Sequence, residues 1–536
     1  MHFVSDIEAE YQAEVKPSQG ESPASYAERI GNNYAMSRDI KHKKKGGQFF
    51  TPLVVAQFMS NQAREIEKPN IRILDPGCGV GTLAASMIES LVVKNRKLKS
   101  VTLTCVEVDM GVLPYTRQLL NYIQNWLNDR SIAFTYKLIN DDFILRFTPS
   151  LHTSDSEEEF DYIISNPPYF KLSKSDPRSV ALAGLNFSQP NIYSAFLTVA
   201  ANLLDKAGQM IFITPRSFTA GLYFTAFRKY FFKNMKLDFV HLFDSRREVF
   251  QKENVLQETM IFTASRIENS VHPDPPVIKV SISAGTKDLD ASILREYKTN
   301  NIIVSADKII HLPSSDSESD VLSIFQTWHG SLHQYGIEIS TGPIVSFRNS
   351  NLISESPYID GCVPMLWLHN IVQMKIQWPV EKPGKGQYIK SSSFDKSLLL
   401  PNRNYVILRR FSAKGDSHRL ISAPFTEEII SDVLLKSAHL IGVENKLNYI
   451  YRPYGTLTNI EAIGLSALLN SRLFNIYFSS FNGNVNVSAY EIRKMPFPPH
   501  DQILEIGEKI HSSGDFSPSN CNNIVNSTLV ETKNIL

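Results

Sequence analysis

The pentapeptide Ser-Asn-Pro-Pro-Tyr at 165–169 follows an apolar run, 160–164, that is typical of a buried strand. The prolines fix the backbone and remove two N–H donors, so the Asn166 side chain and the Pro167 carbonyl can present two rigid acceptors side by side. Two acceptors on the hydrogens of a conjugated amino group favour its pyramidal form and leave the lone pair on nitrogen. Tyr169 adds a face on which a planar substrate can stack. A strand-ending turn is the simpler interpretation, because Asn-Pro commonly marks a strand end.

A glycine-rich turn comes earlier in the chain, after the strand-like run 71–74, with the sequence Asp-Pro-Gly-Cys-Gly-Val-Gly at 75–81. Glycines let the backbone approach a ligand closely, and a helix that starts after them adds free N–H groups. A nucleotide or nicotinamide site fits this turn taken alone. The acid before the glycines, Asp75, favours S-adenosylmethionine, because a carboxylate there can bind the ammonium group that a nicotinamide nucleotide lacks. A tight turn without a ligand is the alternative.

Two later strand ends also carry acids. The run 101–108 contains Glu107, where a carboxylate can accept hydrogen bonds from both hydroxyls of a ribose, and Asp109 is the alternative. The next run is followed by Asp142 and Phe143, an acid and an aromatic ring that suit the amino group and the ring of an adenine. Each feature alone is an ordinary strand end. Three in succession indicate one site for a nucleoside-containing cofactor.

These strand ends must be brought together by a sheet. From residue 47 to about 266, short apolar runs alternate with helical patterns. The predicted strands are 71–74, 101–108, 136–139, 162–164, 210–214, 239–243 and 259–264, and the predicted helices include 83–93, 113–127, 195–204 and 224–232. This alternation predicts an α/β fold with a doubly wound, mostly parallel seven-stranded sheet.

Composition divides the 536 residues into four parts. Residues 1–46 are polar with some helical pattern and are expected to form an N-terminal arm. The α/β domain covers 47–276 and ends in a proline-rich stretch. Residues 277–330 are expected to be a connecting segment, with a strand-like run at its start. In 331–536 the alternation is gone, and short strands, loops and a few helices, notably 460–474, predict a mixed α+β domain.

The overall composition, with 43% hydrophobic and 20% charged residues, is that of a globular protein. No apolar run approaches the roughly 20 residues that span a bilayer, and the N-terminus lacks the pattern of a signal peptide. The four cysteines are scattered, which argues against a disulfide framework and against a zinc site. We therefore expect a reduced, cytoplasmic compartment, no membrane and no metal.

The net charge of +1 does not point to nucleic acid, but local charge does. Residues 371–420 contain ten Lys or Arg against three acids, and 41–45 forms a second basic cluster. Each cluster taken alone is equally well explained as a solvated face. Two such clusters on a neutral chain are the footprint expected for phosphate contacts.

Taken together, these motifs resemble the S-adenosylmethionine-dependent amino methyltransferases, and among them the gamma-class (Taq-type) DNA adenine-N6 methyltransferases of restriction-modification systems. The discriminating feature is Gly-Gln-Phe-Phe-Thr-Pro at 47–52, directly before the glycine-rich turn. In that class a similar segment helps to bind the methionine end of the cofactor. The family order also ends in a long C-terminal target-recognition domain. The resemblance covers 47 to about 266 and extends to the C-terminal half in placement and general style only.

The resemblance implies a role for each matched residue. Cofactor contacts are expected from Phe50, Thr51, Pro52, Asp75, Pro76, Gly77, Gly79, Gly81, Glu107, Asp142, Phe143 and Asn166. The catalytic set is expected to be Asn166, Pro167 and Pro168 for the target amino group, with Tyr169 and Phe250 stacking on the two faces of the target base. A buried core phenylalanine is the alternative for Phe250. The helix start at 191–193 resembles a wall of the pocket.

The resemblance also implies double-stranded DNA as the substrate, a target adenine flipped out of the stack, and a bacterial cytoplasmic location. We expect a monomer, because one subunit carries both catalytic and recognition parts. A separately encoded restriction endonuclease for the same site is compatible with this pattern. Within the C-terminal half, DNA contacts are expected from Arg403, Arg409, Arg410, Lys414 and Arg419. Asn482, Asn484 and Asn486 are interpreted as a turn in preference to recognition residues.

Several alternatives stay open. The Asn-Pro-Pro-Tyr motif also occurs in methyltransferases that act on a protein glutamine amide or on ribosomal RNA, against which the segment 47–52 and the long C-terminal half argue. A cytosine-N4 enzyme usually has Ser in place of Asn166. A catalytically idle DNA-specificity module would not need both motif sets. A fused restriction-and-modification enzyme is suggested loosely by Pro273-Asp274 and by 296–298, but 288–297 is predicted to be helical, where a nuclease would need a strand.

Overall fold

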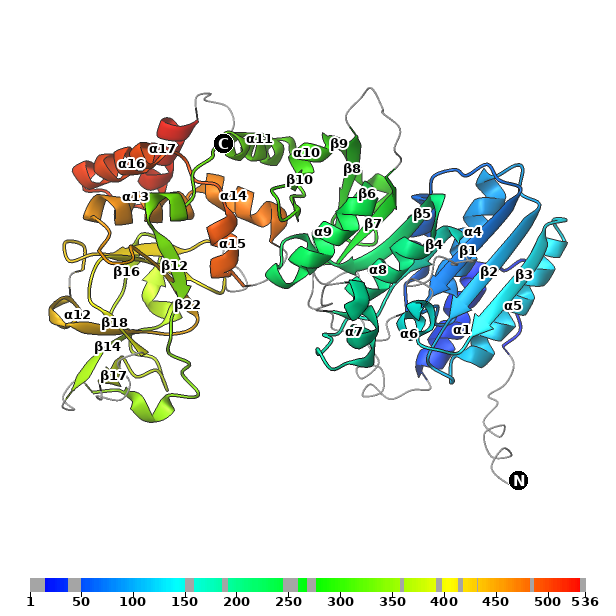
Figure 1. Ribbon diagram of the computed structural model, residues 1–536, viewed down its shortest axis with the longest axis horizontal. Helices are drawn as coiled ribbons and strands as arrows, with labels where there is room; N and C mark the ends of the chain where they lie inside the picture. The colour runs from blue at the N-terminus through cyan, green and yellow to red at the C-terminus, as the bar shows by residue number, and fades with distance from the viewer. Residues whose placement is uncertain are drawn as a thin grey trace. The chain divides into compact units, whose positions relative to one another are not determined.

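The computed structural model describes residues 15–36, 50–149, 159–185, 191–243, 259–267, 276–356, 361–391, 398–412, 418–430, 432–482 and 486–530. The chain divides into two compact units (Figure 1). The first consists of Met1–Phe218 and Tyr223–Ile309, and the second of Thr219–Leu222 and Ile310–Leu536. The first unit therefore extends beyond residue 276, where the sequence predicts the α/β domain to end.

The first unit is built on a nine-stranded sheet with the order β3-β2-β1-β4-β5-β7-β6-β8-β9. Strands β1 to β5 pair in parallel, β7 is antiparallel to both of its neighbours, and β9 is antiparallel to β8. Their bounds are β1 (Asn70–Pro76), β2 (Ser100–Val106), β3 (Ala133–Ile139), β4 (Phe160–Ser165), β5 (Leu204–Pro215), β6 (Met235–Phe243), β7 (Thr259–Arg266), β8 (Val277–Ser283) and β9 (Ile293–Lys298). The predicted doubly wound, mostly parallel fold is confirmed, but the predicted number of seven strands is wrong, because β8 and β9 extend the sheet beyond β6. The strand order reverses between β1 and β4, which is where open α/β sheets bind ligands.

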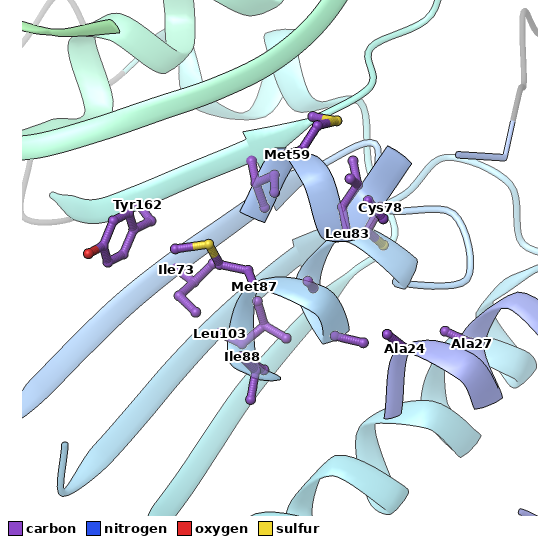
Figure 2. Close-up of a cluster of buried hydrophobic side chains, with 14 of the residues drawn as sticks. Ala24, Ala27, Met59, Ile73, Cys78, Leu83, Met87, Ile88, Leu103 and Tyr162 are labelled. Atoms are coloured by element: carbon purple, nitrogen blue, oxygen red, sulfur yellow. The ribbon is translucent and has the colours of Figure 1, made fainter. Parts of the chain in front are cut away.

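The helices of the first unit are α1 (Pro23–Met36), α3 (Leu53–Asn61), α4 (Thr82–Lys94), α5 (Leu113–Asn128), α6 (Phe143–Phe147), α7 (Pro177–Ala181), α8 (Ile192–Leu203), α9 (Thr225–Asn234) and α10 (Thr299–Ile302). Figure 2 shows one buried cluster in which helices α1, α3 and α4 meet strands β1, β2 and β4, through Ala24, Ala27, Met59, Met87, Ile88, Ile73, Leu103 and Tyr162. The described part of the expected N-terminal arm therefore belongs to the core of this unit. The backbone N–H of Ala24 ties α1 to α4 by donating to Glu89 over 2.7 Å.

The segment expected to connect the two domains adds β8 and β9 to the sheet, next to β6. The predicted helix over 288–297 is wrong, because a short 3-10 turn, Leu289–Ala291, is followed by strand β9. Tyr297 is the buried residue of β9, and the register that pairs Lys279 with Glu296 fixes the strand against β8. The strand removes one argument against a fused nuclease. The other half of that pattern, Pro273-Asp274, lies outside the described residues.

The second unit mixes short strands and helices, as expected for an α+β domain. Its four-stranded sheet has the order β12-β22-β19-β20, and its five-stranded sheet the order β13-β17-β14-β21-β18. The strands are β12 (Glu338–Thr341), β13 (Ile353–Ser354), β14 (Cys362–Leu366), β15 (Ile371–Val372), β16 (Lys375–Ile376), β17 (Tyr388–Lys390), β18 (Leu399–Pro401), β19 (Tyr405–Arg409), β20 (Ser422–Phe425), β21 (Leu440–Val443) and β22 (Leu447–Tyr451). Two further short strands, β10 (Ile303–Val304) and β11 (Ile309–Ile310), pair with each other where the chain passes from the first unit to the second.

The helices of the second unit are α11 (Asp316–Gln326), α12 (Val433–Ser437), α13 (Asn459–Asn470), α14 (Arg472–Phe481), α15 (Ala489–Lys494), α16 (His500–Ser513) and α17 (Pro518–Leu529). The single helix predicted over 460–474 is two helices. Ser471 ends α13 with an extended backbone and caps α14 by accepting a hydrogen bond from the N–H of Phe474. Across the described stretches of both units, no helix combines the length and apolar character that crossing a membrane requires.

Candidate active site

The glycine-rich turn joins the end of β1 to the start of α4. Gly77, Gly79 and Gly81 all have positive φ angles, of 75°, 54° and 96°. A Cβ atom on Gly81 would lie 2.8 Å from a methyl group of Leu119, so this position excludes a side chain on steric grounds as well. The carbonyl of Val106 on β2 accepts from the N–H groups of Gly77 (2.8 Å) and Cys78 (3.0 Å). These two hydrogen bonds fix the turn to the carboxyl end of strand β2.

A cavity of about 240 Å³ lies at this rim of the sheet. Its lining includes these residues predicted for the site: Phe50, Thr51, Gly77, Gly79, Glu107, Asp142, Phe143, Asn166 and Pro168. The lining does not include the other described residues predicted for the site, which are Pro52, Asp75, Pro76, Gly81, Pro167 and Tyr169. Five segments that are far apart in sequence are thus brought together around one cavity, at the rim where a doubly wound sheet binds ligands.

Asp75 is fully buried, two residues before the first lining glycine. Neither carboxylate oxygen has a hydrogen-bond partner among the described residues. Burial raises the pKa of Asp75 to about 8, and the nearby Glu107 carboxylate adds to the rise. The backbone N–H of Ala84 lowers the pKa, although it is not placed to form a hydrogen bond with either oxygen. A cationic ligand group beside Asp75 would favour its ionised form and supply the missing partner, so the site fits the ammonium end of S-adenosylmethionine.

Glu107 lines the cavity and is held by two backbone groups. Its carboxylate oxygens accept from the N–H of Gly79 (2.8 Å) and from the N–H of Asp109 (2.8 Å). Burial raises the pKa of Glu107 above its usual range, although these two hydrogen bonds act in the opposite direction. The alternative, Asp109, instead accepts from the Tyr34 hydroxyl of α1 (2.5 Å) and from the N–H of Gly111 (2.9 Å). The structure places Glu107 in the cavity and gives Asp109 a role in tying α1 to the sheet.

Asp142 and Phe143 form the next part of the wall. One oxygen of Asp142 caps α6 by accepting from the N–H of Leu145 (3.0 Å), and the other accepts from Nε of Arg178 (2.7 Å). The Phe143 ring is buried and packs against Phe196, with 5.0 Å between the ring centres. Arg178 therefore connects the segment after residue 169 to the wall around Asp142.

Asn166 is held at both ends of its carboxamide. Its Nδ2 donates to Oγ1 of Thr51 (3.1 Å), and its Oδ1 accepts from the hydroxyl of Tyr169 (2.6 Å). The Tyr169 hydroxyl also lies 3.0 Å from the carbonyl of Ile213 on β5. Burial raises the pKa of the Tyr169 phenol well above its usual range, so the hydroxyl keeps its proton at neutral pH. The second predicted stacking residue, Phe250, lies outside the described residues.

Sequence reasoning missed several residues of the cavity wall, among them Cys78, Asp141, Phe170, Arg178 and Phe196. Ile192 also lines the cavity and lies in the helix start that was expected to form a wall. Cys78 and Asp141 adjoin predicted residues, so the motifs themselves point to them. Arg178 and Phe196 lie on α7 and α8, away from any strand end, and no local pattern marks them.

The arginines predicted to contact DNA lie on or next to β19 and β20. Arg409 donates to the carbonyl of Ile371 (2.6 Å), Arg410 to that of Asn445 (3.1 Å) and Arg403 to that of Gly455. Arg419 donates to the Asn482 side chain (2.9 Å). Each described guanidinium thus has a partner within its own unit. Lys414 lies outside the described residues.

Asn482, which was interpreted as part of a turn, donates to the carbonyl of Asn486 (3.0 Å) and to the carboxylate of Glu491 (3.0 Å). The interpretation of Asn482, Asn484 and Asn486 as a turn stays a prediction. Asn484 lies outside the described residues. For metals, the described chain contains no group of three or more His, Cys, Asp or Glu side chains placed to hold an ion.

The chain is similar to methyltransferases of restriction-modification systems. A family model of Eco57I restriction-modification methylases matches residues 99–250. The type II methyltransferase M.BsuBI of Bacillus subtilis is 30% identical over 478 residues, which is 88% of this chain and 91% of that protein. M.PstI of Providencia stuartii is 29% identical over 91% of this chain and 93% of its own length. Among solved structures, the cryo-electron-microscopy structure of a DrdV–DNA complex aligns with a TM-score of 0.46 and 13% identity, over 92% of this chain and 60% of that one.

Proposed function

Because this chain belongs to the type II methyltransferases of restriction-modification systems, which take their methyl group from S-adenosylmethionine, we propose that it methylates the N6 amino group of adenine in double-stranded DNA. The observation that carries the proposal is the Asn166 carboxamide, held from both ends beside the cofactor cavity. Within the family we place the chain in the gamma class, because the motif order and the segment 47–52 resemble that class.

Three contacts with the cofactor are proposed, two from residues that line the cavity and one from Asp75, which lies next to the lining glycine turn. The buried carboxylate of Asp75 suits the ammonium group, Glu107 suits the ribose hydroxyls, and Asp142 with the Phe143 ring suits the adenine. The glycine turn and Thr51 supply the intervening wall. When bound, S-adenosylmethionine supplies a methyl group on a positively charged sulfur, so its departure needs no proton from the protein.

The protein's contribution to the transfer is to prepare the target nitrogen. Oδ1 of Asn166 and the carbonyl of Pro167 would accept the two hydrogens of the adenine amino group. This pair of acceptors localises the nitrogen lone pair without reorganisation at the moment of reaction. Pro168 lines the cavity, so this motif borders the methyl donor. The Tyr169 phenol, whose pKa burial raises, acts as a stacking face and not as a base.

The adenine amino group is out of reach inside a duplex, so the target base would leave the stack at a cost of a few kcal/mol. Stacking on Tyr169 and Phe250 would offset part of that cost. Arg403, Arg409, Arg410, Lys414 and Arg419 of the second unit are proposed to contact the DNA as a group. We further propose that the enzyme acts as a monomer in the bacterial cytoplasm, beside a separately encoded endonuclease of the same specificity.

The nearest rival is a methyltransferase acting on a protein glutamine amide or on ribosomal RNA, where the same electronic problem arises. Similarity to two type II methyltransferases over about nine-tenths of the chain, including the C-terminal half, supports DNA over these substrates. A cytosine-N4 enzyme is disfavoured by Asn at position 166, where that class usually has Ser.

The substrate class is tested by incubating the purified protein with tritium-labelled S-adenosylmethionine and, in parallel, unmethylated genomic DNA, bulk ribosomal RNA and a cell-protein fraction. The proposal predicts acid-precipitable label in the DNA reaction that nuclease treatment releases. Label confined to RNA or to protein would refute it and would transfer the Asn166 chemistry to the rival substrate.

A further inference from the structure

The contact between Asn166 and Thr51 joins the Asn-Pro-Pro-Tyr motif to the segment before α3. Thr51 is 7% exposed and lies just before α3, 115 residues from Asn166 in sequence, yet its Oγ1 accepts from Asn166 Nδ2 over 3.1 Å. We propose that Thr51 is a positioning residue for the reaction: its hydroxyl holds the plane of the Asn166 carboxamide so that Oδ1 faces the target amine. The inference rests on the proposed function and gives Thr51 a role beyond a cofactor contact.

Thr51 is itself anchored. At the start of α3, the N–H groups of Val55 and Ala56 both donate to the carbonyl of Pro52 over 3.0 Å. The N–H of Leu53 donates to the Glu28 carboxylate of α1 over 2.9 Å. The residues that follow Thr51 are thus fixed to helix α1 and to the first turn of α3. These contacts fix the position of the Thr51 hydroxyl relative to Asn166.

The other end of the carboxamide is held from a different element. The Tyr169 hydroxyl lies 2.6 Å from Asn166 Oδ1 and 3.0 Å from the Ile213 carbonyl, which belongs to the central strand β5. A carbonyl oxygen has two lone pairs, so Oδ1 can accept from Tyr169 and from the target amine at the same time. The carboxamide is therefore held from the segment before α3 on one side and from Tyr169 on the other.

This support matters because the terminal torsion of an asparagine is broad and has no strong intrinsic preference. A carboxamide that turns over would present N–H donors to an amine that must itself donate. One of the two acceptors for the target nitrogen would then be lost, while the cofactor cavity would keep its shape. Loss of the Thr51 hydroxyl should consequently act on the methyl-transfer step more than on cofactor binding.

The test compares three variants of the full chain. Thr51→Val keeps the shape but removes the hydroxyl, Thr51→Ser keeps the hydroxyl, and Thr263→Val is the matched control. Thr263 is buried on β7, and its hydroxyl has no hydrogen-bond partner among the described residues, so its removal should be neutral. For each variant, kcat and KM for DNA are measured at saturating cofactor, and the cofactor Kd by calorimetry.

The inference predicts that kcat of Thr51→Val falls about 10- to 100-fold, as expected for a misplaced catalytic group, with a cofactor Kd near that of the wild type. Thr51→Ser should recover most of kcat, and Thr263→Val should match the wild type. Thermal unfolding confirms that each variant is folded, and Thr51→Ala replaces Thr51→Val if the latter is not.

Unchanged kcat in Thr51→Val overturns the inference. A weakened cofactor Kd with normal kcat at saturation also overturns it and leaves Thr51 as a cofactor contact only. An equal loss in Thr51→Val and Thr51→Ser overturns it as well, because it shows that the methyl group, not the hydroxyl, is needed. If the wild-type protein transfers no methyl group to DNA, it is the proposed function that fails.

Discussion

Asp75 gives a prediction in which stability and cofactor binding change in opposite directions. Its carboxylate is fully buried without a hydrogen-bond partner among the described residues, and burial raises its pKa from 3.8 to about 8. At neutral pH the cofactor-free protein therefore holds a proton on Asp75 that the unfolded chain has released. The substitution Asp75→Asn removes the charge while keeping the size of the side chain.

The magnitude follows from proton linkage. Because the folded-state pKa is raised, the penalty is absent below pH 3.8 and grows as pH rises to about 8. At 1.36 kcal/mol for each unit, it reaches about 4 kcal/mol at pH 7 and about 5 kcal/mol at pH 8. The protonated acid of the wild type is itself buried without partners among the described residues, so the amide of the variant adds little further cost. The variant should thus be more stable than the wild type at pH 8 by about 5 kcal/mol.

The assay is denaturant-induced unfolding of both cofactor-free proteins at pH 5 and pH 8. The advantage of Asp75→Asn should grow by about 4 kcal/mol between the two pH values. Calorimetry at pH 7 in two buffers of different ionisation enthalpy should show that cofactor binding releases protons from the wild type but not from the weaker-binding variant. A variant that is less stable at pH 8, or whose advantage does not change with pH, would refute the reasoning.

Three further outcomes are expected. Asn166→Ala should abolish methyl transfer yet leave the cofactor Kd from calorimetry almost unchanged; comparable turnover would remove the assigned role. Arg178→Ala should raise the cofactor KM about tenfold, because Asp142 loses a charged hydrogen bond of 2.7 Å at the cavity wall; an effect on kcat alone would contradict this. Burial lowers the pKa of His241 from 6.5 to about 4, so stability should fall by about 3 kcal/mol as pH drops from 6.5 to 4, when only the unfolded chain takes up the proton. A ring that titrates near 6.5 by NMR in the folded protein would rule that out.

The elements of the first unit were predictable because their apolar runs and helical patterns are decided locally. Strand 71–74, for example, lies within β1 and helix 83–93 within α4. Position in the fold was harder to predict than type, since nothing local shows that α1 packs into the core. The helix prediction for 293–298 was wrong for a different reason. Its residues suit a helix, but backbone pairing with β8 makes it an edge strand.

In the candidate site, too, the strand-end residues were predictable and the contacts between them were not. That Glu107, Asp142 and Asn166 line one cavity was predictable, because parallel strands bring their carboxyl ends to one rim, so a motif at each end implies a shared site. The geometry that connects them was not predictable. The Arg178–Asp142 pair and the Thr51–Asn166 contact join residues 36 and 115 positions apart, and no spacing in the sequence encodes such contacts.

The central claim, methyl transfer to the N6 amino group of adenine in DNA, is tested most directly by the mass of the product nucleoside. The purified protein is incubated with S-adenosylmethionine carrying a trideuterated methyl group and with unmethylated genomic DNA, which is then digested and analysed by mass spectrometry. The expected product is deuterated N6-methyldeoxyadenosine, which should be absent when Asn166→Ala replaces the wild type. Deuterated N4-methyldeoxycytidine, or no deuterated nucleoside at all, would contradict it.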